Sequence, residues 1–299
     1  MTTSFPMNAG DGPYSYFKNS HLQREVLDNS KEMVRDAITR KLDIKKIMLS
    51  SSNTLCLADF GCSIGPNTFI AMQHVVQSLK EKYHNTNILE FEVFFNDHVT
   101  NDFNTLFRSV PIDRSYYAFG VPGTFHGTSN VEVLNAYVAQ FEKDMEMFLD
   151  ARAEEIVEGG MMVIISPQSS ECLVKFFGSS LMDLVSEGKI DESLVNSFNL
   201  PIYFPSLEDM AKAVEKNDYF SIEIIELTYP KSKLVDEADA KTLIINLRAV
   251  LEVLFVNHFG SEIAEEAFAR TILKSDEIST WMKTNYQKAC QLFVALKRK

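Results

Sequence analysis

The chain has 299 residues, 45% of them hydrophobic, with a formal net charge of −12 and a pI near 5.0. This acidic balance argues against a nucleic-acid partner, which would need a basic face to neutralise phosphates. The four cysteines show neither a CxxC pair nor Cys/His metal spacing, so we expect a reduced, cytoplasmic setting.

The first nineteen residues are rich in Gly, Pro, Asn and Ser and predict a loop or arm. No basic stretch followed by an apolar run occurs there, so we expect no signal peptide. The segment nevertheless contains Tyr14, Tyr16 and Phe17, which are unusual in a tail that packs against nothing. A helix over 20–42 is predicted next, because its apolar residues recur at helical spacing.

A regular alternation of strands and helices follows. In chain order it predicts a strand over 54–60, a helix over 66–83, a strand over 90–96, a short helix over 101–108, a strand over 115–121, a helix over 131–157 and a strand over 159–166. Strands separated by helices are typical of a parallel sheet with right-handed crossovers. The apolar run "GGMMVIIS" is too short to span a bilayer, so we expect no membrane partner.

The pattern changes after Ser166. It predicts a helix over 172–187, a proline-bounded turn at "NLPIYFPS", a short helix over 207–216, a strand over 220–228, helices over 241–258 and 261–284, and a last strand over 292–297. The sequence contains no internal repeat and no linker. We therefore expect an α/β protein with one sheet domain that carries a helical cap.

The loop after the first predicted strand allows two interpretations. In "LADFGCSIGPNTF", residues 61–65 fit the G-x-S-x-G pattern, in which a serine on a sharp turn is the nucleophile of an α/β-hydrolase. A strand, a glycine-rich turn and a helix also fit a ligand held at a helix N-terminus. The hydrolase interpretation is weak, because His258 is the only late histidine and no HGGG-type motif precedes Ser63.

Two further strand ends favour a cofactor site. Asp97 follows the second strand, where a nucleotide-binding fold carries an acid that binds a ribose diol. Thr124 and Phe125 follow the third strand and offer a hydroxyl group and an aromatic face for adenine. The dinucleotide and P-loop glycine patterns are absent. The order of Asp59, a glycine loop and Asp97 suits S-adenosylmethionine, whose ammonium group would match an acid such as Asp59.

Six blocks of the sequence occur in a recognisable order. They are "MNAGDGPYSYFKNSHLQ", "ADFGCSIGPNTF", "FFNDHVTNDFNTLF", "GVPGTFHG", "FNLPIYFPSLEDM" and "LRAVLEVLFVNHFG". In this order they resemble the SABATH family of plant S-adenosylmethionine-dependent carboxyl methyltransferases, over nearly the whole chain. Members of the family act in plant specialised metabolism on acids such as salicylate, benzoate, jasmonate, loganate, farnesoate and indole-acetate. One branch methylates xanthine nitrogens instead.

The resemblance implies a Rossmann-like methyltransferase sheet with a helical substrate-binding cap. It divides the chain into an arm that closes over the active site (1–19), a cofactor-binding core (20–168) and a helical cap mixed with the remaining strands (169–299). It further implies a homodimer that converts a small carboxylic acid into its methyl ester and releases S-adenosylhomocysteine (SAH). The alternatives are a xanthine- or alkaloid-type N-methyltransferase of the same family, and an α/β-hydrolase that uses Ser63.

The resemblance also implies which residues bind ligands. For the cofactor they are Tyr16, Ser20, Asp59, Gly61, Cys62, Asn67, Asp97, His98, Thr124 and Phe125. For the substrate they are Asn8, Tyr16, Gln23, Leu173, Val174, Phe177, Asn246 and Leu247. Gln23 would hydrogen-bond the substrate carboxylate. For the residues predicted on the helices of the cap, ordinary helix packing is an equally good explanation; these are Leu173, Val174, Phe177, Asn246 and Leu247. Asn8 stands where some salicylate enzymes carry Lys, which counts against salicylate as the substrate.

Two segments depart from the family pattern. The family continues after the position of Gly127 with several tens of residues, including a Ser-Tyr-x-x-His-Trp segment that holds the substrate. Here Gly127 runs straight into "TSNVEVLNAY". Either the chain has lost half of this clamp or loops are absent from the numbered sequence, and the family-like flanks favour the omission. "NSFN" stands where some members read D-x-F-N, a segment linked to Mg²⁺. Because Asn196 replaces the charged ligand, a turn is favoured over an Mg²⁺ site at Asn196, Phe198 and Asn199.

The chemistry of a carboxylic acid substrate explains why no convincing base is found. Such an acid has a pKa of about 4, so it is ionised at neutral pH and can attack the sulfonium methyl group in line without a general base. We therefore assign no catalytic residue and expect the rate to come from alignment and the exclusion of water. Because Trp281 is the only tryptophan, we expect an aliphatic or roomy pocket.

Overall fold

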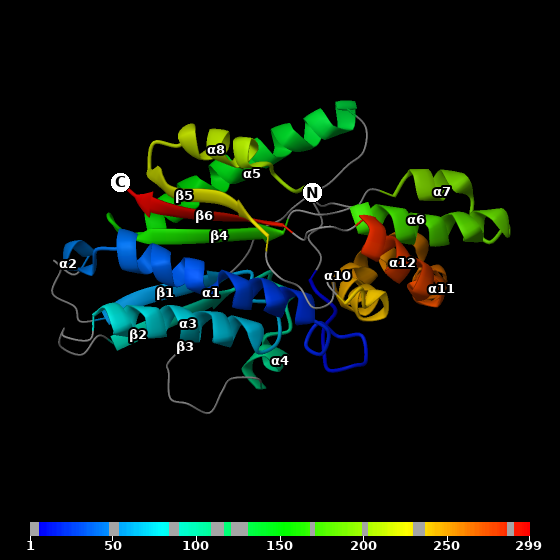
Figure 1. The fold of residues 1–299 in the computed structure, drawn as a ribbon, viewed down its shortest axis with the longest axis horizontal. Coiled ribbons are helices and arrows are strands. Elements are labelled where there is room, and N and C mark those ends of the chain that lie inside the picture. Colours follow the sequence, from blue (N-terminus) through cyan, green and yellow to red (C-terminus); the bar gives the residue numbers. More distant parts are fainter. Residues whose placement is uncertain are drawn as a thin grey trace.

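The computed structural model describes residues 6–47, 54–83, 90–108, 117–120, 131–167, 171–198, 203–229, 237–285 and 290–299. Figure 1 shows two sheets with flanking helices in one part of the molecule and a group of helices at the other end. The N-terminal segment passes between these two parts, next to α10.

The first sheet joins three parallel strands in the order β1-β2-β3. The elements of this part of the chain are α1 (His21–Lys41), α2 (Ile44–Ile47), β1 (Thr54–Phe60), α3 (Asn67–Lys82), β2 (Glu90–Asn96), α4 (Phe103–Arg108) and β3 (Tyr117–Gly120). The register pairs Asn96 with Phe60 on one side and with Gly120 on the other, so the three strands end at the same edge. Buried side chains of α1 and α3, Ile38 and Leu79, pack with Leu55 of β1.

The second sheet has the order β4-β6-β5, and β6 is antiparallel to both of its neighbours. The elements here are α5 (Val131–Glu155), β4 (Met161–Pro167), α8 (Leu207–Glu215), β5 (Phe220–Thr228) and β6 (Gln291–Arg298). Successive residues of a strand face opposite sides of a sheet. Val294 accordingly packs against α5 and α8, whereas Phe293 packs against Ala37 of α1 on the other side. Helix α1 therefore contributes to the core of both sheets.

The expectation of one parallel sheet is wrong for the second half of the chain. The described strands form two separate three-stranded sheets, and the final strand runs antiparallel between β4 and β5. Strand β6 enters directly from the helical group, and antiparallel neighbours need no crossover helix between them. An alternation of strands and helices therefore predicts strand direction only where each strand returns through a helix that covers the sheet.

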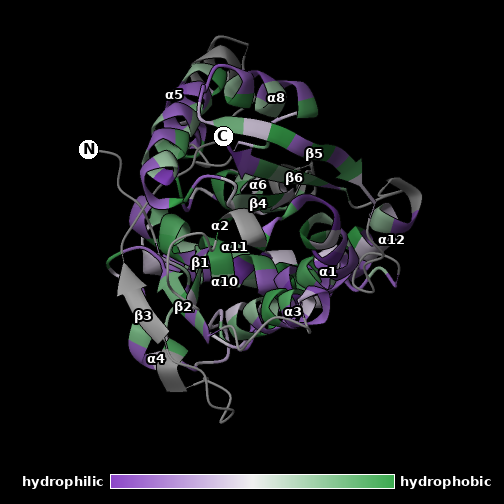
Figure 2. Cartoon of the chain, turned by 90° about the vertical axis from the view of Figure 1, so that its left-hand side faces the viewer, coloured by the Kyte–Doolittle hydropathy of each residue, from purple (hydrophilic) through white to green (hydrophobic). Residues whose placement is uncertain are grey.

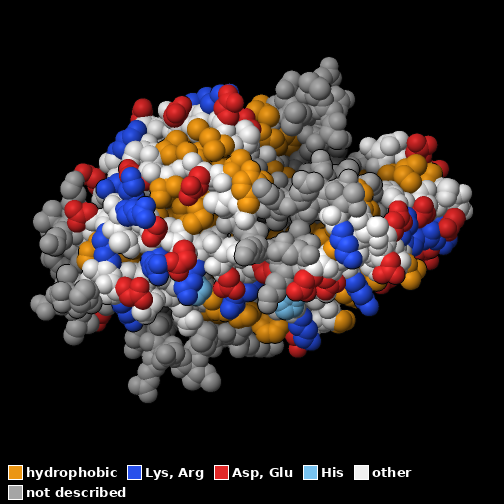
Figure 3. All heavy atoms as spheres, in the orientation of Figure 1, with side chains coloured by type: hydrophobic (Ala, Val, Ile, Leu, Met, Phe, Trp, Pro, Cys, Tyr) orange, Lys and Arg blue, Asp and Glu red, His pale blue; other side chains and the backbone are white. Residues whose placement is uncertain are grey.

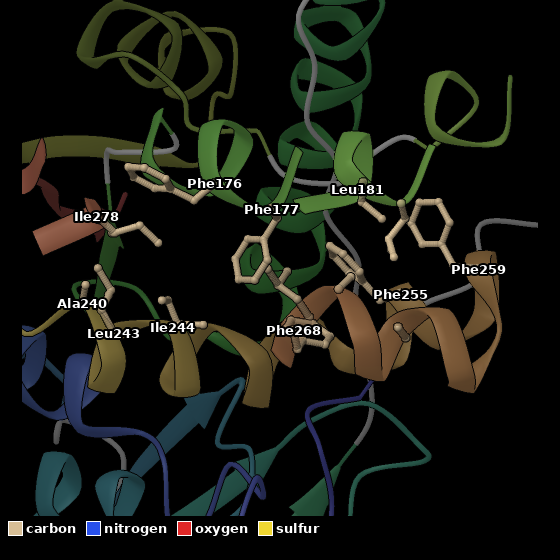
Figure 4. Close-up of a cluster of buried hydrophobic side chains, with 14 of the residues drawn as sticks. Phe176, Phe177, Leu181, Ala240, Leu243, Ile244, Phe255, Phe259, Phe268 and Ile278 are labelled. Carbon is tan, nitrogen blue, oxygen red and sulfur yellow. The ribbon is translucent and has the colours of Figure 1, made fainter. Parts of the chain in front are cut away.

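The helical group has a core of its own. It consists of α6 (Glu171–Ser186), α7 (Glu192–Asn196), α10 (Ala240–Phe259), α11 (Ser261–Leu273) and α12 (Ser275–Asn285). Figure 4 shows that Phe177 of α6 points toward Phe255 of α10 and Phe268 of α11, and these rings make edge contacts with centroids 5.7 and 5.4 Å from that of Phe177. Figure 2 shows that hydrophilic and hydrophobic residues are mixed along the outer helices α5 and α8.

The segment predicted as one helix over 261–284 is two helices. The chain breaks at Lys274, whose N–H is shared by the carbonyl groups of Arg270 and Thr271, each 3.2 Å away. Asp276 and Glu277 then lie in the first turn of α12, where acidic side chains favour a helix start. The short helices α2 and α7 were not predicted, because four or five residues give no readable periodicity.

Among the described helices, α10 alone is long and apolar enough to cross a bilayer by length and composition. Core helices pass the same test, and 44% of its most apolar window is buried inside the protein. Its buried residues include Arg248, which is paired with two carboxylates, so its contacts are those of a core helix.

Candidate functional site

The loop after β1 turns sharply and is tied to the end of β2. Gly61, Ser63 and Gly65 all have positive φ values, of 88°, 52° and 114°. The N–H groups of Gly61 and Cys62 both donate to the carbonyl of Asn96, at 2.8 and 3.1 Å. A Cβ atom at Gly61 would meet no atom of the described residues within 4 Å. The loop therefore has a fixed backbone and leaves open space above its first glycine.

Asp97 holds this loop from the neighbouring strand end. Its Oδ2 accepts the N–H of Ser63 and its Oδ1 accepts the N–H of His98, both at 2.6 Å. The Asn101 amide donates to the carbonyl of Ser63 at 2.9 Å. Ser63 is thus held through both its N–H group and its carbonyl group. Each carboxylate oxygen of Asp97 keeps a further lone pair that a ligand hydroxyl can use.

Asp59, Cys62 and Tyr16 lie close enough to Asp97 to feel its charge. Burial raises the pKa of Asp59, the hydrogen bond from Thr68 opposes this, and the charge of Asp97 raises it further. Burial and the two aspartates also raise the pKa values of Cys62 and Tyr16, so the Tyr16 hydroxyl stays neutral. No described basic group contributes to these shifts. The site therefore has an acidic potential that favours a cationic ligand.

The N-terminal arm covers the loop. Tyr16 is only 9% exposed and packs with Ile64 of the loop and Ala249 of α10. A Cβ atom at Gly65 would lie 3.5 Å from the Cα atom of Phe17. The arm therefore lies directly against the glycine turn, and it places the Tyr16 ring between the sheet edge and α10.

The first residues of α1 and α3 are held together beside the arm. The Asn67 amide donates to the backbone carbonyl of Ser20 at 3.1 Å and to its hydroxyl at 3.0 Å. The carbonyl of Asn246 accepts the N–H of Leu22 at 3.1 Å, and its amide donates to Thr242 at 2.9 Å. Ser20 and Asn67 therefore lie next to the loop, whereas both ends of the Asn246 side chain are already hydrogen-bonded, the oxygen to α1 and the amide within α10.

The predicted substrate residues fall into different environments. The Gln23 Oε1 atom is buried and has no hydrogen-bond partner among the described residues. The Asn8 amide donates to the Tyr14 carbonyl at 3.0 Å and to the carboxylate of Glu252. Phe177 is 5% exposed within the core of the helical group. Of these residues, Gln23 alone has a buried polar group that no described residue pairs with, as expected of a group that binds a ligand.

The remaining predicted residues cannot be assigned to a binding site from the described contacts. Leu247 packs against the apolar core of the helical group. Leu173 and Val174 belong to α6, with side chains outside the described set. Thr124, Phe125 and Asn199 lie outside the described residues.

The residues suggested for Mg²⁺ do not fit that ion. Asn196 is exposed at the end of α7, and the Phe198 ring packs against Phe255 and Phe259. Within the described ranges no three His, Cys, Asp or Glu side chains come together to hold a metal. A cation that prefers carboxylate ligands finds none in this set.

Among the described residues, His258 does not reach Ser63 as the base of the hydrolase alternative. The Ser63 hydroxyl is buried, and none of the residues that the structure describes hydrogen-bonds to it. The His258 Nε2 atom lies 2.9 Å from the Leu194 carbonyl, at the far end of α10. Nine residues of helix separate His258 from Ala249, which packs beside the loop, and this corresponds to about 13 Å. Ser63 is therefore a turn residue whose peptide group serves Asp97 and Asn101.

Sequence reasoning gave no role to three residues that organise the site. Asn101 holds Ser63, and Asp102 accepts the Gly10 N–H at 3.2 Å and the Thr105 N–H at 3.0 Å. An aspartate just before a helix is a typical N-cap, so Asp102 could have been found. Arg248 is buried beside the arm, and no local pattern marks such a long-range contact.

Comparison with known proteins gives matches over the whole chain. The profile of a family described as SAM dependent carboxyl methyltransferase matches residues 2–128 and 126–299. A loganic acid O-methyltransferase of Catharanthus roseus is 37% identical over 351 residues, covering 98% of this chain and 94% of that protein. Paraxanthine methyltransferase 2 of Arabidopsis thaliana is 33% identical over 338 residues, covering 93% and 94%.

A solved structure of a loganic acid methyltransferase with SAH has a TM-score of 0.88 to this chain, at 34% identity, and the match covers 98% of this chain and 99% of that one. The two profile matches meet at 126–128, beside Gly127, after which the sequence departs from the family pattern. The 351-residue alignment is longer than this chain, so that relative carries residues without a counterpart here. The Rossmann-like fold class and the S-adenosylmethionine cofactor expected from the sequence are confirmed. The chain belongs to the family of S-adenosylmethionine-dependent carboxyl methyltransferases.

Proposed function

We propose that this protein methylates the carboxylate of a small organic acid and that the loop after β1 holds the methyl donor. The observation that carries the proposal is the acidic pair Asp59 and Asp97, which lies at one sheet edge beside the open space over Gly61. When bound, S-adenosylmethionine supplies a methyl group on a cationic sulfonium and leaves as SAH. An acidic, partly buried edge suits a ligand with this charge.

Within this proposal, the described residues divide the cofactor among them. Asp97 accepts the ribose hydroxyls with His98 beside it, and Asp59 accepts the ammonium group. Gly61 and Cys62 provide the close backbone approach, and Ser20 and Asn67 provide polar contacts. Tyr16 closes the site from the arm. Thr124 and Phe125 are proposed for the adenine from their place after the third strand and from the family resemblance.

Gln23 is proposed to orient the substrate carboxylate. Its buried Oε1 atom has no partner in the described part of the chain, and rotation of the amide by a half turn would aim the NH₂ group at the same place. A carboxylic acid with a pKa of about 4 is already ionised, so no residue needs to remove a proton. The neutral Tyr16 and the covering arm exclude water without adding a competing charge.

We further propose a cytoplasmic homodimer that binds neither nucleic acid nor membranes. The net charge of −12 supports the first exclusion. On the face shown in Figure 3, basic and acidic side chains are interspersed and form no basic patch. The homodimer is proposed from the family resemblance. The cytoplasmic compartment is proposed from the four cysteines, which show neither a CxxC pair nor metal-binding spacing.

The test is incubation with methyl-labelled S-adenosylmethionine and a panel of plant carboxylic acids and xanthines. We expect label in the methyl ester of at least one acid, identified by mass spectrometry. The 33% identity to a paraxanthine methyltransferase makes N-methylation the second candidate. Label in a xanthine and in no acid would establish that second activity and overturn the first.

A further inference from the structure

A buried arginine lies where the N-terminal arm meets the helical group. Arg248 of α10 is 2% exposed. Its Nε donates to Glu252 at 3.0 Å, its Nη1 donates to Glu265 of α11 at 3.2 Å, and its Nη2 contacts both carboxylates. Burial alone would lower the pKa of Arg248, but the hydrogen bonds to Glu265 and Glu252 outweigh it and raise that pKa. Four hydrogen bonds therefore join this cation to Glu252 of α10 and Glu265 of α11.

The flat face of the same guanidinium is directed at the arm. Its Cζ atom lies 3.6 Å from the centre of the Tyr14 ring. Such a distance is typical of a stacked cation–aromatic contact, which an arginine makes well because its guanidinium is planar. Tyr14 belongs to the arm, so one cation that is hydrogen-bonded on α10 and α11 also stacks on a different part of the chain.

Asn8 is bound next to this stack. Its N–H donates to the Ala249 carbonyl at 2.9 Å, and its amide donates to the Oε2 atom of Glu252. Arg248 holds the other oxygen of the same carboxylate, Oε1. Arg248 therefore contacts the arm twice, directly through Tyr14 and indirectly by orienting Glu252 for Asn8.

The part of the arm fixed in this way continues directly into the residues that cover the cofactor loop. Tyr16 follows Tyr14 by two residues and donates its N–H to the Asn8 carbonyl at 2.9 Å. Phe17 then lies against Gly65. The position of Tyr16 and Phe17 over the loop thus depends on where Tyr14 and Asn8 are held.

We propose that Arg248 is a positioning residue that holds the arm closed over the cofactor loop through Tyr14 and Glu252. It touches neither the loop nor Asp59 and Asp97 in any described contact, and it acts through the arm. The proposal rests on the proposed function, because the loop is the proposed cofactor site. It assigns the closure of that site to a residue of the cap.

The direct test uses Tyr14→Leu, which removes the stack and leaves the hydrogen bonds of Arg248 in place. Tyr14→Phe keeps the ring and serves as the conservative variant. Tyr219→Leu is the matched control, because Tyr219 lies 4.8 Å from the Arg298 guanidinium in a similar contact away from the arm. Arg248→Lys keeps the charge but loses the planar face, and it is combined with Tyr14→Leu in a double-mutant cycle.

The first readout is amide hydrogen exchange of the protein without cofactor. The N–H groups of Asn8, Gly10 and Tyr16 are all hydrogen-bonded and report the arm. We expect exchange about tenfold faster in Tyr14→Leu and in Arg248→Lys, and little further acceleration in the double variant. Tyr14→Phe and Tyr219→Leu should match the wild type. Unchanged arm exchange in Tyr14→Leu, or additive effects in the double variant, would overturn the proposal.

The second readout is the dissociation constant for SAH, which we expect to rise about five- to tenfold in Tyr14→Leu while it stays near wild type in Tyr14→Phe. Because the exchange experiment contains no cofactor, it decides the role of Arg248 separately from the proposed function. Failure of the wild type to bind SAH would overturn the proposed function. Wild-type affinity for SAH in Tyr14→Leu would instead overturn the proposal that the contact between Arg248 and Tyr14 holds the arm over the cofactor loop.

Discussion

The carboxyl edge of the first sheet and the packed helices around α10 both contain residues predicted to bind ligands, but they use them differently. At the sheet edge, Asp59 and Asp97 lie near each other beside open space over Gly61. In the helical group, both ends of Asn246 are hydrogen-bonded and Phe177 is buried among aromatic rings. A residue at a strand end is placed by the backbone, and its side chain stays available to a ligand. Whether a side chain on a helix is available to a ligand depends on its contacts with the neighbouring helices.

The largest effect is expected for Asp97→Ala. This change removes the proposed ribose contact and also frees the N–H groups of Ser63 and His98. We expect the dissociation constant for SAH to rise by about 100-fold, as for the loss of a charged hydrogen-bond acceptor at an interface. Isothermal titration calorimetry measures it, with the exposed Asp218→Ala as control. Equal affinities in the two variants would mean that the cofactor does not bind at this edge.

Gln23→Glu should weaken binding of the acid substrate and leave binding of the cofactor almost unchanged. It would place a second carboxylate against that of the substrate, and like charges repel strongly where water is excluded. We expect the KM for the acid to rise by about 10- to 30-fold while the SAH affinity changes less than twofold. Gln23→Met, which has similar length and no charge, should show a smaller rise. A KM that is unaffected in both variants would remove Gln23 from the substrate site.

Asp59→Asn should separate stability from function. The pKa of Asp59 is raised above its ordinary 3.8 in the folded protein, chiefly by burial. The folded state therefore binds this proton more tightly, and the contribution of Asp59 to stability is lost as the pH rises through its folded pKa. At neutral pH we expect Asp59→Asn to raise the Tm of the cofactor-free protein by about 1–3 °C. We also expect it to raise the dissociation constant for SAH about tenfold. A lower Tm would show that the Thr68 hydrogen bond outweighs the burial.

Phe177→Leu should have the smallest functional effect. Phe177 packs in the core with Phe255 and Phe268, so we expect a loss of about 1–2 kcal/mol in the free energy of unfolding. The ratio of kcat/KM between two acids should not change. Phe255→Leu is the matched control, since it belongs to the same cluster and was never predicted to line the pocket. A changed acid preference in Phe177→Leu alone would return this residue to the substrate pocket.

The sequence predicts local features of this fold well. The strand limits 54–60 and 90–96 agree with β1 and β2, because each is an apolar run bounded by turn residues. The position of Asp97 beside the glycine loop follows from parallel pairing, since parallel strands end at the same edge. Features set by a few neighbouring residues, such as the Lys274 break, also have signals in the sequence, although the break itself was missed.

Long-range contacts could not be predicted from the sequence. The insertion of β6 between β4 and β5 depends on a partner strand more than a hundred residues away in the chain. The same holds for Asn8, whose amide reaches Glu252, and for Arg248, whose guanidinium stacks on Tyr14. Resemblance to a family suggests which positions bind ligands, but the packing of this particular chain decides which side chains remain unpaired, as Gln23 does and Asn246 does not.

The central claim is that alignment, without a general base, drives methyl transfer to an ionised carboxylate. The most direct measurement is the pH dependence of kcat/KM for an acid that the enzyme methylates, from about pH 6 to pH 9. Because the acid is ionised well below this range and the Tyr16 hydroxyl stays neutral within it, we predict a flat profile, unchanged in Ser63→Ala. A rise in rate with an apparent pKa between about 6 and 8 would reveal an essential base and contradict the account.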